Sequence, residues 1–165
     1  MRKLSFSKAN LLKGLDMLNS FVRDMEEKDL SAVDEIEKLC FVAPWKKADI
    51  QVELDSNPFA TLLVVEVNNQ VVGFADFWVT FDSATICQIA VHPDYQRNHL
   101  GSSLMDEILK DCYAKKVNHL TLEVRESNTK GIAFYQKYGF KTVLIKEKYY
   151  TNGENALYMV KEVNA

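Results

Sequence analysis

The chain has 165 residues, with 20 Lys and Arg against 23 Asp and Glu, a formal net charge of −3, and 47% hydrophobic residues. This balance is typical of one soluble globular domain and lacks the basic stripe that nucleic acid or an anionic membrane would require. Neither is expected as a partner. The three cysteines lie far apart and form no C-x-x-C pair, which indicates neither a disulfide framework nor a zinc site and favours a cytoplasmic setting.

The N-terminal part of the chain is expected to be helical. Residues 1–20 form a predicted extension before a single domain that spans 21–165, and leucines from Leu11 onward continue at helical spacing to Val22. The apolar residues between Asp29 and Phe41 follow a period of 3.6, which predicts a helix with Glu35 and Glu37 turned outward. Pro44 ends this helix, and a shorter helix is expected over 46–54.

The middle of the chain changes to strand patterns. Ala60–Val67 and Val71–Phe81 are rich in β-branched and aromatic residues, and Asn68-Asn69 between them predicts a hairpin turn. Thr85–Val91 is a third predicted strand, which ends at His92-Pro93-Asp94. These three strands are expected to form an antiparallel group.

The last third alternates helices and strands. A helix is predicted from Leu100 to Cys112, a strand over His119–Val124, and a helix over Asn128–Tyr138 that closes at Gly139. Two closing strands are predicted over Phe140–Lys148 and Asn155–Val163. The expected fold is therefore α/β of the α+β type: a mixed, mostly antiparallel central sheet flanked by helices, with a locally parallel strand pair.

The segment from Val91 to Ser103 has the features of an anion-binding turn. A strand end feeds a polar turn that opens a helix, where backbone N–H groups point outward with partial positive charge. Arg97 adds a full charge, and Gly101 allows a close backbone approach. The segment is neither G-x-x-x-x-G-K-[ST] nor G-x-G-x-x-G, so a nucleoside triphosphate or a dinucleotide is disfavoured.

This turn resembles the acetyl-CoA signature Q/R-x-x-G-x-G/A of the GNAT superfamily of N-acetyltransferases, over Gln96 to Gly101. His99 stands where the family usually has its first glycine. If that position needs a positive φ, a histidine there is strained. The resemblance implies a GNAT fold, with the parallel strand pair at the cofactor cleft. It also implies that acetyl-CoA is the cosubstrate and is bound by Ile89, Ala90, Val91, Gln96, Arg97, Asn98, His99, Leu100, Gly101, Ser102 and Asn128.

Two further segments are similar to RimI-like enzymes, the ribosomal-protein alanine N-acetyltransferases. They are Leu122–Asn128, with the sequence LEVRESN, and Ile132–Phe140, with the sequence IAFYQKYGF. The resemblance implies acetyl transfer to a protein N-terminus, in which Glu123 accepts a proton and Tyr135 is the general acid. Direct transfer is expected because Cys112 fits an apolar helix face rather than a nucleophile. It also implies that Trp45, Tyr149 and Tyr150 contact the acceptor.

The residues alone leave other interpretations open for each of these side chains. A partly buried carboxylate within the apolar strand around Glu123 would have a raised pKa suited to base catalysis, but the strand pattern also fits a solvent-facing residue. A helical tyrosine such as Tyr135 commonly packs in a core with its hydroxyl in water. Ser127 fits a helix N-cap, and Cys112 fits a buried apolar position rather than a nucleophile.

Two other functions remain open at this stage. An enzyme of the same fold can acetylate a small amine, such as a polyamine or an antibiotic, and a noncatalytic module can bind acyl-CoA without transferring the acyl group. The three histidines have no metal-ligand spacing, so no metal is expected. A monomer or weak homodimer is predicted.

Overall fold

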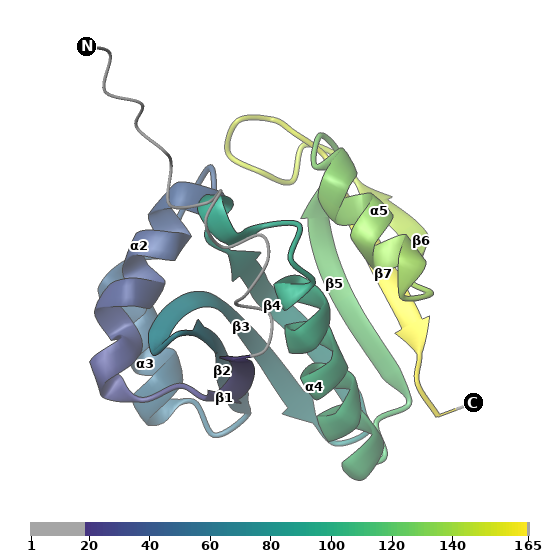
Figure 1. Ribbon diagram of the computed structural model, residues 1–165. Coiled ribbons are helices and arrows are strands. Elements are labelled where there is room, and N and C mark those ends of the chain that lie inside the picture. The colour runs from purple at the N-terminus through teal and green to yellow at the C-terminus, as the bar shows by residue number, and fades with distance from the viewer. Residues whose placement is uncertain (1–18, 165) are drawn as a thin grey trace. The chain divides into compact units, whose positions relative to one another are not determined.

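The computed structural model describes residues 19–164 of the chain (Figure 1). Seven strands, four α-helices and two short 3-10 helices lie in this range. In chain order they are β1 (Ser20–Asp24), η2 (Glu27–Asp29), α2 (Leu30–Cys40), α3 (Lys47–Ser56), β2 (Ala60–Val67), β3 (Gln70–Thr80), β4 (Ser83–Val91), η3 (Pro93–Tyr95), α4 (Leu100–Ala114), β5 (His119–Arg125), α5 (Thr129–Lys137), β6 (Lys141–Lys146) and β7 (Ala156–Glu162).

The strands follow the order β1-β2-β3-β4-β5-β7-β6. β4 and β5 run parallel, with Ser83 opposite His119, whereas β5 pairs antiparallel with β7 and places Glu123 opposite Tyr158. The register between β6 and β7 shifts between Thr142 and Leu144. The predicted mixed sheet with one locally parallel pair is confirmed.

The chain divides into two compact units, each with its own buried residues. The first comprises 19–58, Leu62–Ala75 and Ile89–Glu107, and the second comprises Phe59–Thr61, Asp76–Gln88 and 108–164. In the first unit α2 packs beside α3, as Figure 1 shows. Its buried core residues include Val33, Ile36, Val64, Val65, Phe74, Leu104 and Met105. Those of the second unit include Phe77, Ile108, Leu120, Leu122, Phe140 and Met159.

The hairpin and helix boundaries follow the local sequence closely. Asn68 and Asn69 have φ of 52° and 63°, the left-handed conformation that a two-residue hairpin turn requires and that Asn tolerates well. Gly139 follows α5 with φ of 87°, as predicted for a residue beyond a helix C-terminus. The predicted ends of β2 and the start of α4 also match the structure.

Three expectations about the N-terminal half are wrong. Val22 lies in strand β1 rather than in a helix, because Phe21 and Val22 pair with Glu66 and Val65 of β2. Within α2, Glu37 is fully buried rather than turned outward, and Leu39 is 51% exposed although it is one of the apolar residues that follow the helical period. The rest of the predicted N-terminal helix lies outside the described residues.

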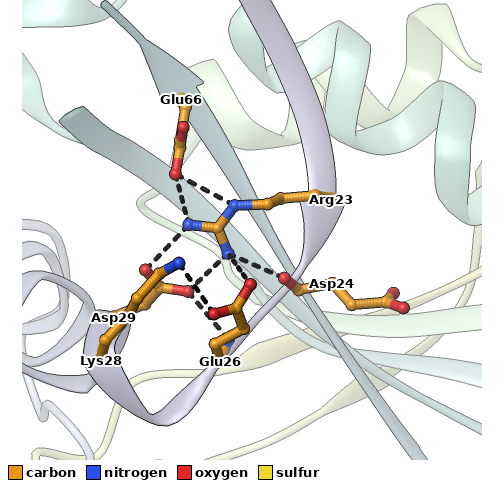
Figure 2. A network of polar contacts seen from close by, with 6 residues as sticks. All are labelled: Arg23, Asp24, Glu26, Lys28, Asp29 and Glu66. Carbon is orange, nitrogen blue, oxygen red and sulfur yellow. Dashed lines mark hydrogen bonds and ion pairs between the residues drawn. The ribbon is translucent and has the colours of Figure 1, made fainter. Parts of the chain in front are cut away.

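An arginine network fixes β1 at the edge of the sheet (Figure 2). The Arg23 guanidinium donates to both carboxylate oxygens of buried Asp29, at 2.6 and 2.9 Å, and its Nε donates to Glu66 of β2 at 3.0 Å. These bonds hold the pKa of Asp29 below its usual range and raise the pKa of Arg23. The short strand β1 is thereby bound to β2 and to the start of α2.

No helix in residues 19–164 is long and apolar enough to cross a lipid bilayer.

Candidate functional site

The turn between β4 and α4 has an unusual backbone. Arg97 and His99 have φ of 64° and 60°, so both adopt the left-handed conformation. The Gln96 side chain donates to the Val91 carbonyl at 3.0 Å, and the Asn98 side chain donates to the Tyr95 carbonyl at 3.0 Å. The turn is therefore held by side-chain bonds to its own main chain. His99 therefore has the positive φ that was the condition for strain at this position.

This geometry suits an anion. The His99 carbonyl accepts the Ser103 N–H at 3.0 Å, so α4 begins at this point and its first turn directs backbone N–H groups toward the preceding loop. Left-handed residues next to a helix N-terminus form a concave group of amides of the kind that binds phosphate. Arg97 is exposed and Leu100 is buried, so the turn presents a cationic side chain to solvent and is anchored by an apolar one. The residues of the turn therefore fit a diphosphate group.

The backbone of β3 packs closely against the end of β4, the strand that leads into this turn. A Cβ atom added to Gly73 of β3 would lie 2.9 Å from the Ala90 carbonyl oxygen, so glycine is required for this approach. The Val91 carbonyl accepts a second bond, from the Cys40 thiol at 3.4 Å. The predicted residues Ile89, Ala90 and Val91 therefore lie on a fixed strand end.

Trp45 also lies in the first unit, on the loop between α2 and α3. Its backbone N–H donates to Glu37 Oε1 at 2.6 Å, and Glu37 is fully buried. This bond explains why Glu37 faces inward: its carboxylate binds the main chain of the loop that follows its own helix. The sequence pattern did not reveal this partner, because Trp45 follows eight residues later across Pro44.

In the second unit, Glu123 of β5 lies beside a cation. Its carboxylate accepts a hydrogen bond from the Lys146 ammonium at the end of β6, and its side chain is 27% exposed. A hydrogen bond between Tyr149 and this carboxylate raises the pKa of the Tyr149 hydroxyl. Of the two positions that the sequence left open for Glu123, partly buried or facing solvent, the structure shows a partly buried side chain. Lys146 was missed, because β6 is separated from β5 in the sheet by β7.

Tyr135 of α5 belongs to an aromatic group. Its ring makes edge contacts with Phe134 and Phe140, at centroid distances of 5.5 and 5.8 Å. Burial raises the pKa of its hydroxyl well above the ordinary value, and the nearby Tyr150 raises it further. The phenol is therefore protonated at neutral pH, which is the state that a proton donor needs.

The loop after β6 is fixed by ion pairing. Arg125 lies 3.8 Å from the Tyr150 ring centroid and donates to Glu154 at 3.0 Å. Glu154 also accepts the Ser127 N–H at 3.0 Å and the Ser127 hydroxyl, and these bonds lower its pKa to about 2. The Tyr149 and Tyr150 rings meet edge to face, with centroids 5.2 Å apart. The second unit thus brings Glu123, Tyr135, Tyr149 and Tyr150 together.

The helix cap before α5 differs from the prediction. Asn128, rather than Ser127, is the N-cap of α5, and its side chain accepts the Gly131 N–H at 3.0 Å. Ser127 instead binds Glu154. The reason is tertiary: Glu154 lies 27 residues further on, and its carboxylate takes both the backbone and hydroxyl donors of Ser127.

The remaining candidates have structural positions. Cys112 is fully buried on α4, and burial raises the pKa of its thiol to about 11, which opposes a role as nucleophile. Among residues 19–164, no group of three or more His, Cys, Asp or Glu side chains is arranged to hold a metal ion.

A cavity of about 440 Å³ in the first unit is lined by Lys28, Asp29, Glu35, Glu66 and His92, among others, and includes none of the predicted site residues.

The sheet has one parallel strand pair, and β4 of that pair leads into a turn with two left-handed residues at the start of α4. The Acetyltransferase (GNAT) family model matches residues 30–140, and the chain belongs to this family. It is an acetyl-CoA-dependent N-acetyltransferase, as the resemblance implied.

Two relatives indicate which branch of the family this chain resembles. The ribosomal protein bS18-alanine N-acetyltransferase of Escherichia coli (strain K12) is 34% identical over 148 residues, which cover 87% of this chain and 97% of that protein. A Bacillus subtilis (strain 168) protein, provisionally given the same name, is 38% identical over 144 residues, which cover 87% and 95%. The RimI-like resemblance is confirmed.

Solved structures agree with the fold. The crystal structure of the Escherichia coli ribosomal-protein-S18-alanine N-acetyltransferase superposes with a TM-score of 0.81 at 32% identity, covering 88% of this chain and 95% of that one. The structure of Ard1 from Thermoplasma volcanium gives 0.83 at 30% identity, covering 88% and 99%.

Proposed function

We propose that this enzyme acetylates the N-terminal α-amino group of a protein, and that the acceptor is the N-terminal alanine of a small-subunit ribosomal protein. The observation that carries the proposal is the cluster in which the Glu123 carboxylate and the protonated Tyr135 phenol accompany the paired rings of Tyr149 and Tyr150. The names of the relatives at 34% and 38% identity support the acceptor. A ribosomal-protein acceptor supports a cytoplasmic location for the enzyme.

The chemistry needs one base and one acid. An α-amino group has a pKa of roughly 7.7–8.0, against about 10.4 for a lysine side chain, so a single carboxylate is a sufficient base for it. Glu123 takes one proton from the acceptor ammonium, and the neutral amine nitrogen then forms its bond to the acetyl carbonyl carbon; the second proton leaves the nitrogen for water as the amide forms. Tyr135 donates its proton to the sulfur as the carbon–sulfur bond breaks.

The turn has a positioning role. Acetyl-CoA supplies the thioester whose acetyl group is transferred. We assign its diphosphate to the amides of Gln96–Ser102, with Arg97 providing a full positive charge, and its pantetheine arm to the backbone of Ile89, Ala90 and Val91. We also assign Asn128 to cofactor binding, although its side chain caps α5 as well. Trp45, Tyr149 and Tyr150 are assigned to the acceptor.

The experiment compares acceptors in a thiol-release assay. A peptide that begins with alanine is tested against the same peptide with a blocked N-terminus and against spermidine. We expect turnover only with the free peptide N-terminus, and mass spectrometry should place the acetyl group on the α-amino nitrogen. Turnover with spermidine alone would contradict the proposal and favour the small-amine enzyme.

A further inference from the structure

Lys146 occupies a site with the chemistry of an ammonium receptor. Its Nζ donates to Glu123 and lies 5.1 and 5.2 Å from the ring centroids of Tyr149 and Tyr158. A carboxylate with two aromatic rings is a favourable environment for a cation of this size. The hydrogen bond to Glu123 raises the pKa of Lys146, so the side chain is an ammonium ion at neutral pH.

The geometry also allows Lys146 to leave. The residue is the last of β6, its side chain is 32% exposed, and the flexible stem can carry the charged end into water. Ion pairs with this degree of exposure stabilise a structure only weakly, because water solvates both partners well. The carboxylate of Glu123, at 27% exposed, is also within reach of a ligand.

We infer that Lys146 is a specificity-determining residue: in the free enzyme its ammonium occupies the acceptor-ammonium site formed by Glu123, Tyr149 and Tyr158, and the acceptor N-terminus must displace it. The inference rests on the proposed function. When a protonated N-terminus binds, its ammonium replaces the Lys146 ammonium and makes the same interactions with Glu123 and the two rings. An uncharged acceptor cannot replace these interactions, so it does not displace Lys146. Lys146 therefore lowers the affinity for the acceptor, which must displace it, and takes no part in proton transfer.

The test measures binding of an alanine-initiated peptide by calorimetry without acetyl-CoA, together with the KM and kcat for that peptide. The variant Lys146→Met keeps the length of the side chain and removes its charge. We expect the peptide to bind roughly two- to five-fold tighter, with KM lowered by the same factor and kcat changed less than KM. Lys141→Met, an exposed position at the other end of β6, is the matched control and should match the wild type.

The outcomes separate the two proposals. If the peptide binds Lys146→Met as it binds the wild type, or more weakly, the displacement inference is overturned while the proposed function stands. If the peptide neither binds nor is acetylated by any of the proteins, the proposed function fails and the inference fails with it. Lys146→Gln provides the same comparison with a shorter polar side chain, and melting curves confirm that each variant is folded.

Discussion

The turn between β4 and α4 and the cluster around Glu123 are built in opposite ways. The turn depends on main-chain conformation, with Arg97 and His99 in the left-handed region and their neighbours bonded to nearby carbonyls. The cluster depends on side chains that come from β5, β6, β7 and the loop after β6. A main-chain site should respond to changes in backbone freedom, whereas a side-chain site should respond to the loss of single polar atoms.

The largest effect is expected in the cluster, from Tyr135→Phe. If Tyr135 is the proton donor, its removal should lower kcat by about 10²–10⁴-fold, because the departing thiolate then has no positioned acid, while affinity for acetyl-CoA changes little. Thiol release measures the first quantity and calorimetry the second. Tyr113→Phe, at an exposed tyrosine of α4, should have wild-type turnover. Full activity of Tyr135→Phe would remove this residue from the mechanism.

A second prediction concerns β3, which packs against the strand that leads into the turn. In Gly73→Ala the new methyl group meets the Ala90 carbonyl oxygen and a Val65 methyl group, each at 2.9 Å, so β3 or β4 must shift. We expect a loss of about 1–3 kcal/mol in unfolding free energy and weaker acetyl-CoA binding. Thermal melts and calorimetry measure these. Thr80→Ala, exposed at the end of β3, is the control, and an unchanged melting temperature for Gly73→Ala would contradict the packing.

A smaller effect tests the strain in the turn directly. His99→Gly removes the side chain from a residue with φ of 60°, and we expect it to raise stability by up to about 1 kcal/mol, or roughly 2–4 °C in Tm. His99→Val should lower the Tm, because a β-branched residue tolerates this conformation poorly. Asp94→Gly, at an exposed residue without a positive φ, should not stabilise. Equal Tm values for the Gly and Val variants would refute the strain.

The same contrast explains what the sequence could and could not predict. The strand-turn-helix order and the hairpin turn at Asn68-Asn69 are local, so spacing and residue type were sufficient, whereas strain at His99 was expected only if that position has a positive φ. Lys146 beside Glu123, Glu154 beside Ser127, and Glu37 beside the Trp45 amide each depend on chain packing that no period in the sequence encodes. The strand β1 was missed because its five residues pair with β2 across more than 35 intervening residues.

The smallest effect concerns the pH dependence of the loop after β6. The bonds from Ser127 and Arg125 lower the pKa of Glu154 from 4.5 to about 2, so its ionised form is favoured in the folded state. The resulting stabilisation is complete above about pH 4.5 and is lost as the pH falls toward 2. A carboxyl NMR titration should give a midpoint near 2, and Ser127→Ala should raise it. A midpoint near 4.5 in the wild type would show that these bonds do not form.

The central claim is that main-chain amides of the turn bind the diphosphate of acetyl-CoA. Its most direct test is a titration of the ¹⁵N-labelled enzyme with acetyl-CoA, followed by amide chemical shifts. The account predicts saturable shifts that are largest at the amides of residues 96–102, including Gly101. Saturable binding that leaves these amides unchanged, or no binding at all, would contradict it.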